Sequence, residues 1–323
     1  MKATLLLLAF VLASMVSPAH AETHLTKSGR SFYINGKMIN AGTPAAGILV
    51  NARMVNAVFE DTKRPAFDPQ ANTNEFLARM SDYMNAGVDA FTISLQGGNP
   101  GYEGAKNTAI NPDGTLKVSY MDRVAEVIEA ADQRGAAIIL GIYYQRQDEY
   151  VRDEAAVKAG VVNVMKWAAS RGYQNVIVEI VNEYGHTGFD HAILRSASGV
   201  ASLINLAKQT APGIMVTASG YGDGVLAKEI IAASSVLVIH LNGVNPSGYA
   251  KKINALKSYN KPIICNEDPK AGSTGATAAS SAVSAGAGWG YLHRSNQDYP
   301  FVFKGPAEAS TVYNRFKALT ARQ

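Results

Sequence analysis

Short runs of apolar, β-branched residues alternate with longer amphipathic runs from about residue 54 to the C-terminus. Short runs of this kind predict strands, and longer runs with a period of 3.6 residues predict helices. The predicted strands are Met54–Phe59, Val88–Leu95, Ala136–Tyr144, Asn175–Val181, Ile214–Ala218, Val236–Leu241, Pro262–Asn266 and Gly288–His293. The predicted helices cover residues 72–86, 119–134, 153–171, 191–210, 224–233, 247–258, 274–285 and 306–320. The pattern therefore predicts eight successive β–α units.

Two of the predicted strands, at residues 136–144 and 175–181, are apolar almost throughout. Such strands must be covered on both faces, as in a parallel sheet wrapped by helices. Eight repeats favour a closed (β/α)8 TIM barrel of the α/β class over an open doubly wound sheet. No G-x-G-x-x-G motif follows any predicted strand, which argues against a dinucleotide site. Before the first unit, Ser31–Ile39 predicts a β-hairpin that turns at Asn35-Gly36 and is placed to close the bottom of the barrel.

The first 21 residues have the features of a secretory signal peptide. Lys2 precedes the apolar run Leu5–Val16, and Ala19-His20-Ala21 forms a small-x-small cleavage site. The apolar run is about half as long as a membrane-spanning helix. We therefore expect a secreted or periplasmic protein with no membrane span, whose residues 22–323 form a single catalytic domain.

Charge and cysteine content exclude several classes of protein. The chain has 30 Lys and Arg and 26 Asp and Glu among 323 residues, without a basic cluster that would indicate nucleic-acid binding. Cys265 is the single cysteine, so an intrachain disulfide is excluded. Stability must therefore come from a large apolar core. Nothing in the pattern indicates an oligomeric state.

Candidate chemistry lies where two apolar strands end. Glu183 follows the fourth predicted strand and Glu267 follows the seventh, and (β/α)8 barrels carry their active sites at the carboxyl ends of the strands. Two carboxyl groups about 5 Å apart there would serve as the proton donor and nucleophile of a retaining glycosidase, whereas a wider gap favours inversion. Glu179, on the same strand as Glu183, is expected to point into the barrel, where a buried carboxylate needs a partner.

The pair Asn182-Glu183 after strand four, the second glutamate after strand seven, and the hairpin Phe32–Lys37 resemble one enzyme clan. This is the clan of retaining (β/α)8 glycoside hydrolases that includes the family 5 cellulases and mannanases. The resemblance implies a carbohydrate substrate and no cofactor. It also implies that Glu183 is the acid/base, that Glu267 is the nucleophile, and that Asn182 binds the sugar 2-hydroxyl.

The chain also differs from this clan at several positions. His240 matches the histidine of strand six, but Asn242 stands where those enzymes usually have a tyrosine bonded to the nucleophile. Their arginine near the end of strand two is missing, and Arg146 after strand three is the candidate replacement. Trp289 matches a tryptophan that lies under the sugar. The predicted substrate-binding residues are Asn182, His240, Asn242, Trp289, Tyr291, Tyr144 and Arg146.

Two other functions remain open. Metal-dependent hydrolysis would use His186, His240 and His293 at strand ends, but the chain lacks an H-x-H pair and an H-x-x-x-H motif, so we predict no metal. The departures on strands two and six leave open a non-catalytic carbohydrate-binding barrel or a polysaccharide lyase. The sugar, the linkage, and endo or exo action depend on loop shapes that the sequence pattern does not determine.

Overall fold

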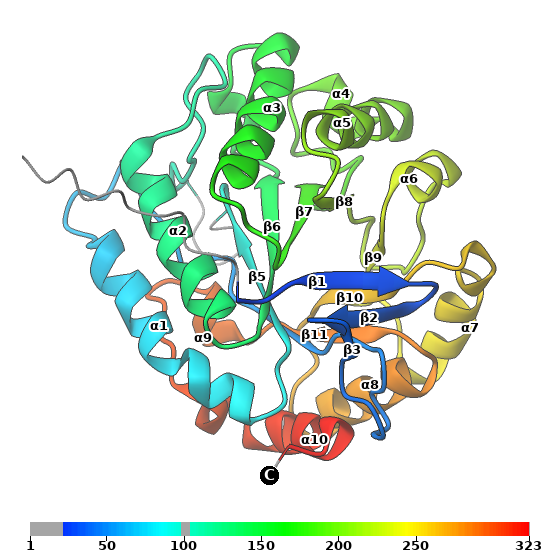
Figure 1. The fold of residues 1–323 in the computed structure, drawn as a ribbon. Coiled ribbons are helices and arrows are strands. Elements are labelled where there is room, and N and C mark those ends of the chain that lie inside the picture. The colour runs from blue at the N-terminus through cyan, green and yellow to red at the C-terminus, as the bar shows by residue number, and fades with distance from the viewer. Residues whose placement is uncertain (1–21, 98–103, 323) are drawn as a thin grey trace, which may run out of the picture.

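The computed structural model describes residues 22–97 and 104–322, which form a barrel of parallel strands surrounded by helices (Figure 1). The predicted signal peptide lies outside the described residues. The barrel sheet has the order β8-β7-β6-β5-β4-β11-β10-β9, and neighbouring strands are parallel. Its strands are β4 (Asn51–Arg53), β5 (Ala90–Ser94), β6 (Ala137–Tyr143), β7 (Val176–Val181), β8 (Met215–Thr217), β9 (Leu237–His240), β10 (Ile263–Asp268) and β11 (Gly288–Tyr291). The (β/α)8 prediction is confirmed.

The barrel closes least tightly between β8 and β9, the two ends of the strand order. Where the other neighbours share registers of two to five residue pairs, these two strands are joined within the described chain by an isolated parallel bridge between Ser219 and Val238. We call this junction the seam of the barrel. It separates the half of the sheet that carries Glu183 from the half that carries Glu267.

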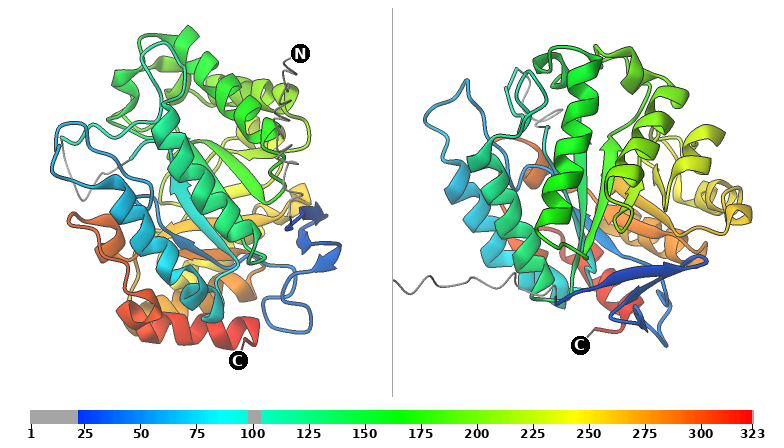
Figure 2. Two further views of the ribbon diagram at one scale, coloured as in Figure 1. Left: turned by 60° about the vertical axis from the view of Figure 1, so that its left-hand side comes forward. Right: turned by 45° about the horizontal axis from the view of Figure 1, so that its top comes forward.

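Helices cover the outside of the barrel (Figure 2). They are α1 (Pro69–Asn85), α2 (Val118–Asp132), α3 (Glu154–Ser170), α4 (Ala192–Arg195), α5 (Ala197–Thr210), α6 (Lys228–Ala233), α7 (Tyr249–Asn254), α8 (Gly272–Ser284), α9 (Arg294–Gln297) and α10 (Ser310–Thr320). Short 3-10 turns lie at Asp148–Tyr150, Pro246–Gly248, Lys257–Tyr259 and Gly305–Ala309. The predicted helix 191–210 is divided because Ser196 is extended and its hydroxyl caps α5 by accepting from the amide of Gly199.

The prediction of a first barrel strand at Met54–Phe59 is wrong, because β4 lies just before it at Asn51–Arg53. Asn51 and Arg53 interrupt the apolar run, so their polarity resembles that of a loop. Both are buried inside the barrel, where their side chains make polar contacts with other strands. Asn51 donates to the carbonyl of Cys265 on β10 at 3.1 Å.

The N-terminal hairpin forms and closes one end of the barrel, in front of the strands in Figure 1. Strands β2 (Ser31–Ile34) and β3 (Lys37–Met38) are joined by Asn35-Gly36, both with positive φ, and β1 (Leu25–Ser28) adds a third antiparallel strand. Phe32 is buried in a cluster with Ile139, Val238 and other residues from the strands. The opposite end of the barrel is thereby left for the site. Within the described residues, no helix is long and apolar enough to cross a membrane.

Candidate active site

Three ionisable side chains meet at the carboxyl end of the barrel. Glu183 follows β7, Glu267 lies near the end of β10, and His240 ends β9. One ligand atom from each lies within 4.8 Å of those of the other two. The Nδ1 atom of His240 is 3.0 Å from Oε1 of Glu183 and 3.8 Å from Oε2 of Glu267. The two carboxyl groups therefore face one another with a separation close to the ~5 Å of retaining glycosidases.

Two local irregularities turn these glutamates toward each other. The pairing of β10 shifts register between Cys265 and Glu267, and a bulge of this kind redirects the side chain that follows it. Glu183 has a φ of +54°, a left-handed conformation that costs a non-glycine residue free energy. Ser219 holds this turn, because its hydroxyl accepts from the amide of Glu183 at 3.0 Å and its carbonyl accepts from Tyr184 at 3.0 Å.

Glu267 is surrounded by donors. Arg53 places its NH2 group 2.9 Å from Oε2, and the Asn242 amide donates to Oε1 at 2.7 Å. Burial alone would raise the pKa of Glu267, but the charges of Arg53 and His240 and the Asn242 hydrogen bond lower it below its ordinary value. Glu267 is therefore held as a carboxylate, the form that a nucleophile requires.

His240 is fully buried between the two glutamates. Burial opposes its protonation, but the charge of Glu267, the hydrogen bond to Glu183 and the charge of Glu183 raise its pKa above the ordinary value. Its ring is therefore a cation over a wider pH range than a free imidazole. The predicted site residues His240 and Asn242 both lie in direct contact with a glutamate of the pair.

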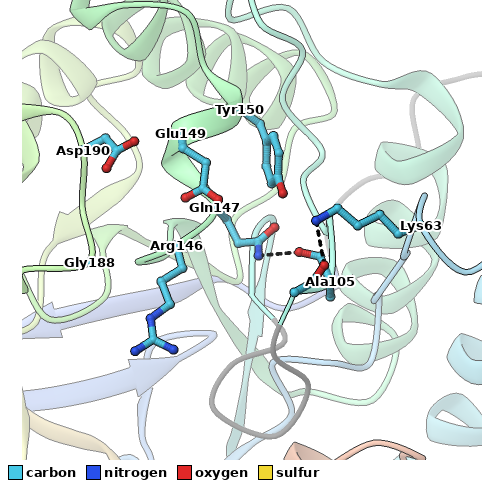
Figure 3. Close-up of a pocket in the computed structure, with 9 residues that line it drawn as sticks. Lys63, Ala105, Arg146, Gln147, Glu149, Tyr150, Gly188 and Asp190 are labelled. Carbon is cyan, nitrogen blue, oxygen red and sulfur yellow. Dashed lines mark hydrogen bonds between the residues drawn. The ribbon is translucent and has the colours of Figure 1, made fainter.

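Arg53 is a site residue that the sequence reasoning missed. Its fully buried guanidinium contacts Glu267 and also donates to Oδ1 of Asn182 at 2.8 Å. The positive charge next to Glu267 thus comes from Arg53, whereas Arg146 was the predicted source. Arg146 instead lines a separate cavity of about 640 Å³ together with Lys63, Glu149 and other residues (Figure 3).

Trp289 and Tyr291 do not lie at the site. Gly288 and Gly290 of β11 face the barrel interior, where a Cβ would clash with the Leu49 carbonyl and with the side chain of Asn51. Strand alternation therefore directs Trp289 and Tyr291 outward, where both are buried. Trp289 packs edge-on against Phe316 of α10 and donates to Asp268 at 2.8 Å. Predicting them as sugar contacts is wrong because the strand presents its glycines, not its aromatic residues, to the barrel.

Asn182 and Tyr144 lie beside the pair. Asn182 accepts from Arg53 and donates to Gln145 at 3.2 Å. Burial, the negative charge of Glu267 and the positive charge of Arg53 all act on Tyr144, whose pKa is raised. Glu179 lies deeper in the barrel, as expected from its strand position, and accepts from Asn266 at 2.9 Å.

A cavity of about 730 Å³ opens next to Glu267. Its lining residues are Tyr144, Asn242, Glu267, Pro269, Leu292, Arg294, Gln297, Asp298 and Tyr299. Ligand sites combine apolar walls with a few oriented polar groups, and this cavity has both. Its volume is sufficient for more than one sugar ring, given that ligand pockets span about 300–1,000 Å³.

The cluster of Glu183, His240 and Glu267 also has the spacing of a metal site. However, Arg53 and Asn242 already contact the two oxygens of Glu267. A cation placed there would lie next to the guanidinium and would have to displace one of these donors. Glu267 therefore has the surroundings of a carboxylate that is paired with N–H donors, rather than those of a metal ligand.

Several solved structures share the fold: the GH5-4 broad specificity endoglucanase from Clostridium longisporum has a TM-score of 0.61 at 11% identity, with 84% of this chain and 97% of that chain covered. The endo-1,4-β-mannanase from Rhizomucor miehei has a TM-score of 0.59 at 12% identity over 93% and 100% of the two chains. A glycoside hydrolase 5 lichenase from Caldicellulosiruptor sp. F32 has a TM-score of 0.60 at 13% identity, with 92% of this chain and 98% of that chain covered.

No curated protein matches the chain significantly in sequence. The model of the cellulase family, glycosyl hydrolase family 5, matches residues 57–267. This range ends at Glu267 and contains Glu183, His240 and Asn242, so it covers both facing glutamates. The chain therefore belongs to glycoside hydrolase family 5.

Proposed function

We propose that this glycoside hydrolase cleaves the O-glycosidic bonds of an oligo- or polysaccharide with retention of anomeric configuration. Glu183 is the acid/base and Glu267 is the nucleophile. The observation that supports this most is the facing pair of carboxyl groups, whose oxygens lie within 4.8 Å while Arg53 and Asn242 hold one of them as a carboxylate. A gap of this size is too narrow for the water of an inverting mechanism.

In the first step, the carboxyl group of Glu183 gives its proton to the glycosidic oxygen as the bond to the anomeric carbon breaks. A carboxylate oxygen of Glu267 forms a bond to the same carbon, which yields a glycosyl ester and releases the leaving sugar as an alcohol. His240 positions Glu183 through the 3.0 Å contact of its Nδ1 atom with Oε1.

In the second step, the Glu183 carboxylate removes a proton from water, and the resulting oxygen attacks the anomeric carbon. The ester bond breaks and Glu267 is released as a carboxylate. Arg53 and Asn242 stabilise this leaving group, because their positive charge and N–H donor contact its two oxygens.

Two further features of this proposal concern substrate and location. The structural neighbours are named as endoglucanases, a lichenase and a mannanase, so β-glucans and mannans are the first substrates to test. The apolar run Leu5–Val16 followed by Ala19-His20-Ala21 supports export to the periplasm or the medium. N-terminal sequencing of the exported protein tests this, with Glu22 expected as the first residue.

Stereochemistry and trapping test the mechanism together. Proton NMR during hydrolysis should show a first-formed product with the anomeric configuration of the substrate. A 2-deoxy-2-fluoro glycoside with an activated leaving group should inactivate the enzyme, and peptide mass spectrometry should place the label on Glu267. An inverted product, or a label on another residue, would refute the assignment. Binding without turnover would favour the carbohydrate-binding alternative.

A further inference from the structure

Glu179 lies inside the barrel, deeper than the two glutamates that face each other at the site. It stands on β7, four residues before Glu183. Strand alternation puts its side chain on the same face as Ile177, which lies in one apolar cluster with Phe32 of the hairpin. The residue is only 1% exposed. Because burying a carboxyl group is costly unless other groups compensate, its contacts indicate what it does.

The residue next to the nucleophile binds one oxygen of Glu179. The side-chain amide of Asn266 donates to Oε2 of Glu179 at 2.9 Å, and Asn266 directly precedes Glu267 on β10. The backbone carbonyl of Asn266 accepts from Nη1 of Arg53 at 3.4 Å. Asn266 is therefore held from two sides. Its side chain links β7 to β10 through the barrel interior, without passing through β8, β9 and the seam.

Glu179 also acts on the charge of Arg53. Burial lowers the pKa of Arg53, but neighbouring charges raise it above its ordinary value, with Glu267 contributing most and Glu179 among the others. Arg53 is thus attracted by two carboxyl groups, of which only Glu267 lines the cavity. Together with the nucleophile, Glu179 supplies the second negative charge that balances the two cations Arg53 and His240. Buried charges require such partners.

We propose that Glu179 is a positioning residue for the nucleophile, which acts through Asn266 and Arg53 rather than on the substrate. Its hydrogen bond to Asn266 fixes the backbone from which Glu267 extends. Its negative charge restrains the attraction between Arg53 and Glu267. Without this second charge, Arg53 would act on Glu267 alone and hold it as a less basic carboxylate.

The other charged and titratable groups near Glu267 come from several elements. They are Arg53 of β4, Tyr144 after β6, Glu183 after β7 and His240 of β9, with Arg294 and Asp298 of the cavity wall, which pair with each other at 3.0 Å. Glu179 is not among the described residues that line the cavity. Replacing it with glutamine therefore removes one negative charge near Glu267 and leaves these other groups in place.

Labelling of Glu267 by an activated 2-deoxy-2-fluoro glycoside measures this effect, because the rate of inactivation follows the ionised fraction of the nucleophile. In Glu179→Gln, loss of a negative charge should move the acid limb of the inactivation rate to lower pH by about 0.5 to 1 unit. The plateau of this rate should fall by about tenfold, since a less basic carboxylate is a weaker nucleophile. A lower plateau with an unmoved limb would indicate a merely structural role and overturn the inference.

Thr217→Val is the matched control. Thr217 is buried on β8, is paired in register with Glu179, and carries no charge. Its hydroxyl donates to the carbonyl of Val236 at 2.9 Å, so the variant should lose stability, as expected when a buried hydrogen bond is removed. Its acid limb should coincide with that of wild type. A shift equal to that of Glu179→Gln would show that the limb reports a general loosening of the barrel, which would contradict the role of Glu179.

Exchanging the hydrogen-bonded pair gives a second test, which also covers a Glu179→Gln variant that does not fold. The double variant Glu179→Gln/Asn266→Asp restores a donor, an acceptor and one negative charge, with the donor now on β7. Its acid limb should lie at the wild-type pH or above it, because the charge has moved next to Glu267. Its plateau should exceed that of Glu179→Gln and that of Asn266→Asp.

Circular dichroism establishes whether each variant folds. A double variant that does not fold, that has its acid limb below that of wild type, or that gains no rate over the single variants would refute the inference. Wild-type enzyme that is not labelled by the 2-fluoro sugar would instead refute the proposed function, on which this inference rests.

Discussion

At the residue scale, the two glutamates were predictable and their partners were only partly so. Glu183 and Glu267 stand where apolar strands end, which makes them visible in the sequence. Arg53 could not be recognised from the sequence, because polar residues inside the barrel interrupt the apolar run in the same way as the polar residues of a loop. Asn242 stands where the similar enzymes usually have a tyrosine, and the structure places its amide 2.7 Å from Glu267.

The two glutamates have different roles, so variants of them should respond differently to a small anion. Glu183→Ala should lower kcat/KM on oligosaccharides by about 10²- to 10⁴-fold, the usual contribution of a general acid. Azide should accelerate turnover of an activated aryl glycoside by this variant, because it attacks the glycosyl ester without needing a base. The product should be a glycosyl azide with the configuration of the substrate, identified by NMR. Azide that leaves the rate unchanged would argue against Glu183 as acid/base.

Asn242 contributes to keeping Glu267 ionised. Removing its donor in Asn242→Ala should raise the pKa of Glu267 and lower the plateau of kcat/KM by about tenfold to a hundredfold. The nucleophile must be deprotonated, so activity is lost as the pH falls through this pKa. The acid limb of the profile of kcat/KM against pH should therefore move to higher pH in the variant, while Asn245→Ala, outside the cluster, should keep the wild-type limb.

At the element scale, β10 and β11 are joined by a buried polar contact outside the barrel. Asp268 follows Glu267 directly and accepts hydrogen bonds from Trp289 and from Tyr249 of α7, and Lys270 lies 3.1 Å from its other oxygen. The residue that the sequence suggested as a sugar platform thus anchors the strand end that carries the nucleophile. The repeat of glycines at positions 288 and 290 is the sequence signal for this orientation, because small residues mark the crowded face of a strand.

Trp289→Phe tests whether Trp289 anchors this strand end. The substitution removes the donor to Asp268 and leaves a small cavity, so the free energy of unfolding should fall by about 2–4 kcal/mol. Thermal denaturation followed by circular dichroism would measure the loss. KM for oligosaccharides at a temperature where the variant is folded should stay within about twofold of wild type, because Trp289 is fully buried on the outside of the barrel. A large rise in KM with unchanged stability would restore the sugar-platform interpretation.

At the scale of the whole molecule, eight β–α units and the hairpin were predictable because their periodicity extends along the chain. Three segments far apart in the sequence come together at a site that no local pattern indicates. Asp89 at the bottom of the barrel accepts from Asn40, which follows the hairpin, and from the amide of Val50, and it pairs with Arg322 after α10. Its carboxyl group thereby connects three distant segments.

This buried carboxyl group makes stability depend on pH. Burial raises the pKa of Asp89 to about 6, although Arg322, Asn40 and Val50 partly oppose this. The folded state therefore retains a proton that the unfolded state releases, and the free energy of unfolding falls as the pH rises from about 4 to 6. Asp89→Asn should flatten this slope by up to about 3 kcal/mol across the window, measured by urea unfolding at several pH values. An unchanged slope would show that Asp89 is ionised throughout.

The seam between β8 and β9 lies between the two strands that position the facing glutamates. Glu183 and Glu267 lie on opposite sides of it, and β8 and β9 are joined there by the bridge between Ser219 and Val238 and by the hydrogen bond that the Thr217 hydroxyl donates to the carbonyl of Val236. Ser219 is also the residue that fixes the turn of Glu183. Ser219 therefore both joins β8 to β9 and holds the turn that carries Glu183, so its replacement would disturb the barrel wall and the position of Glu183 together.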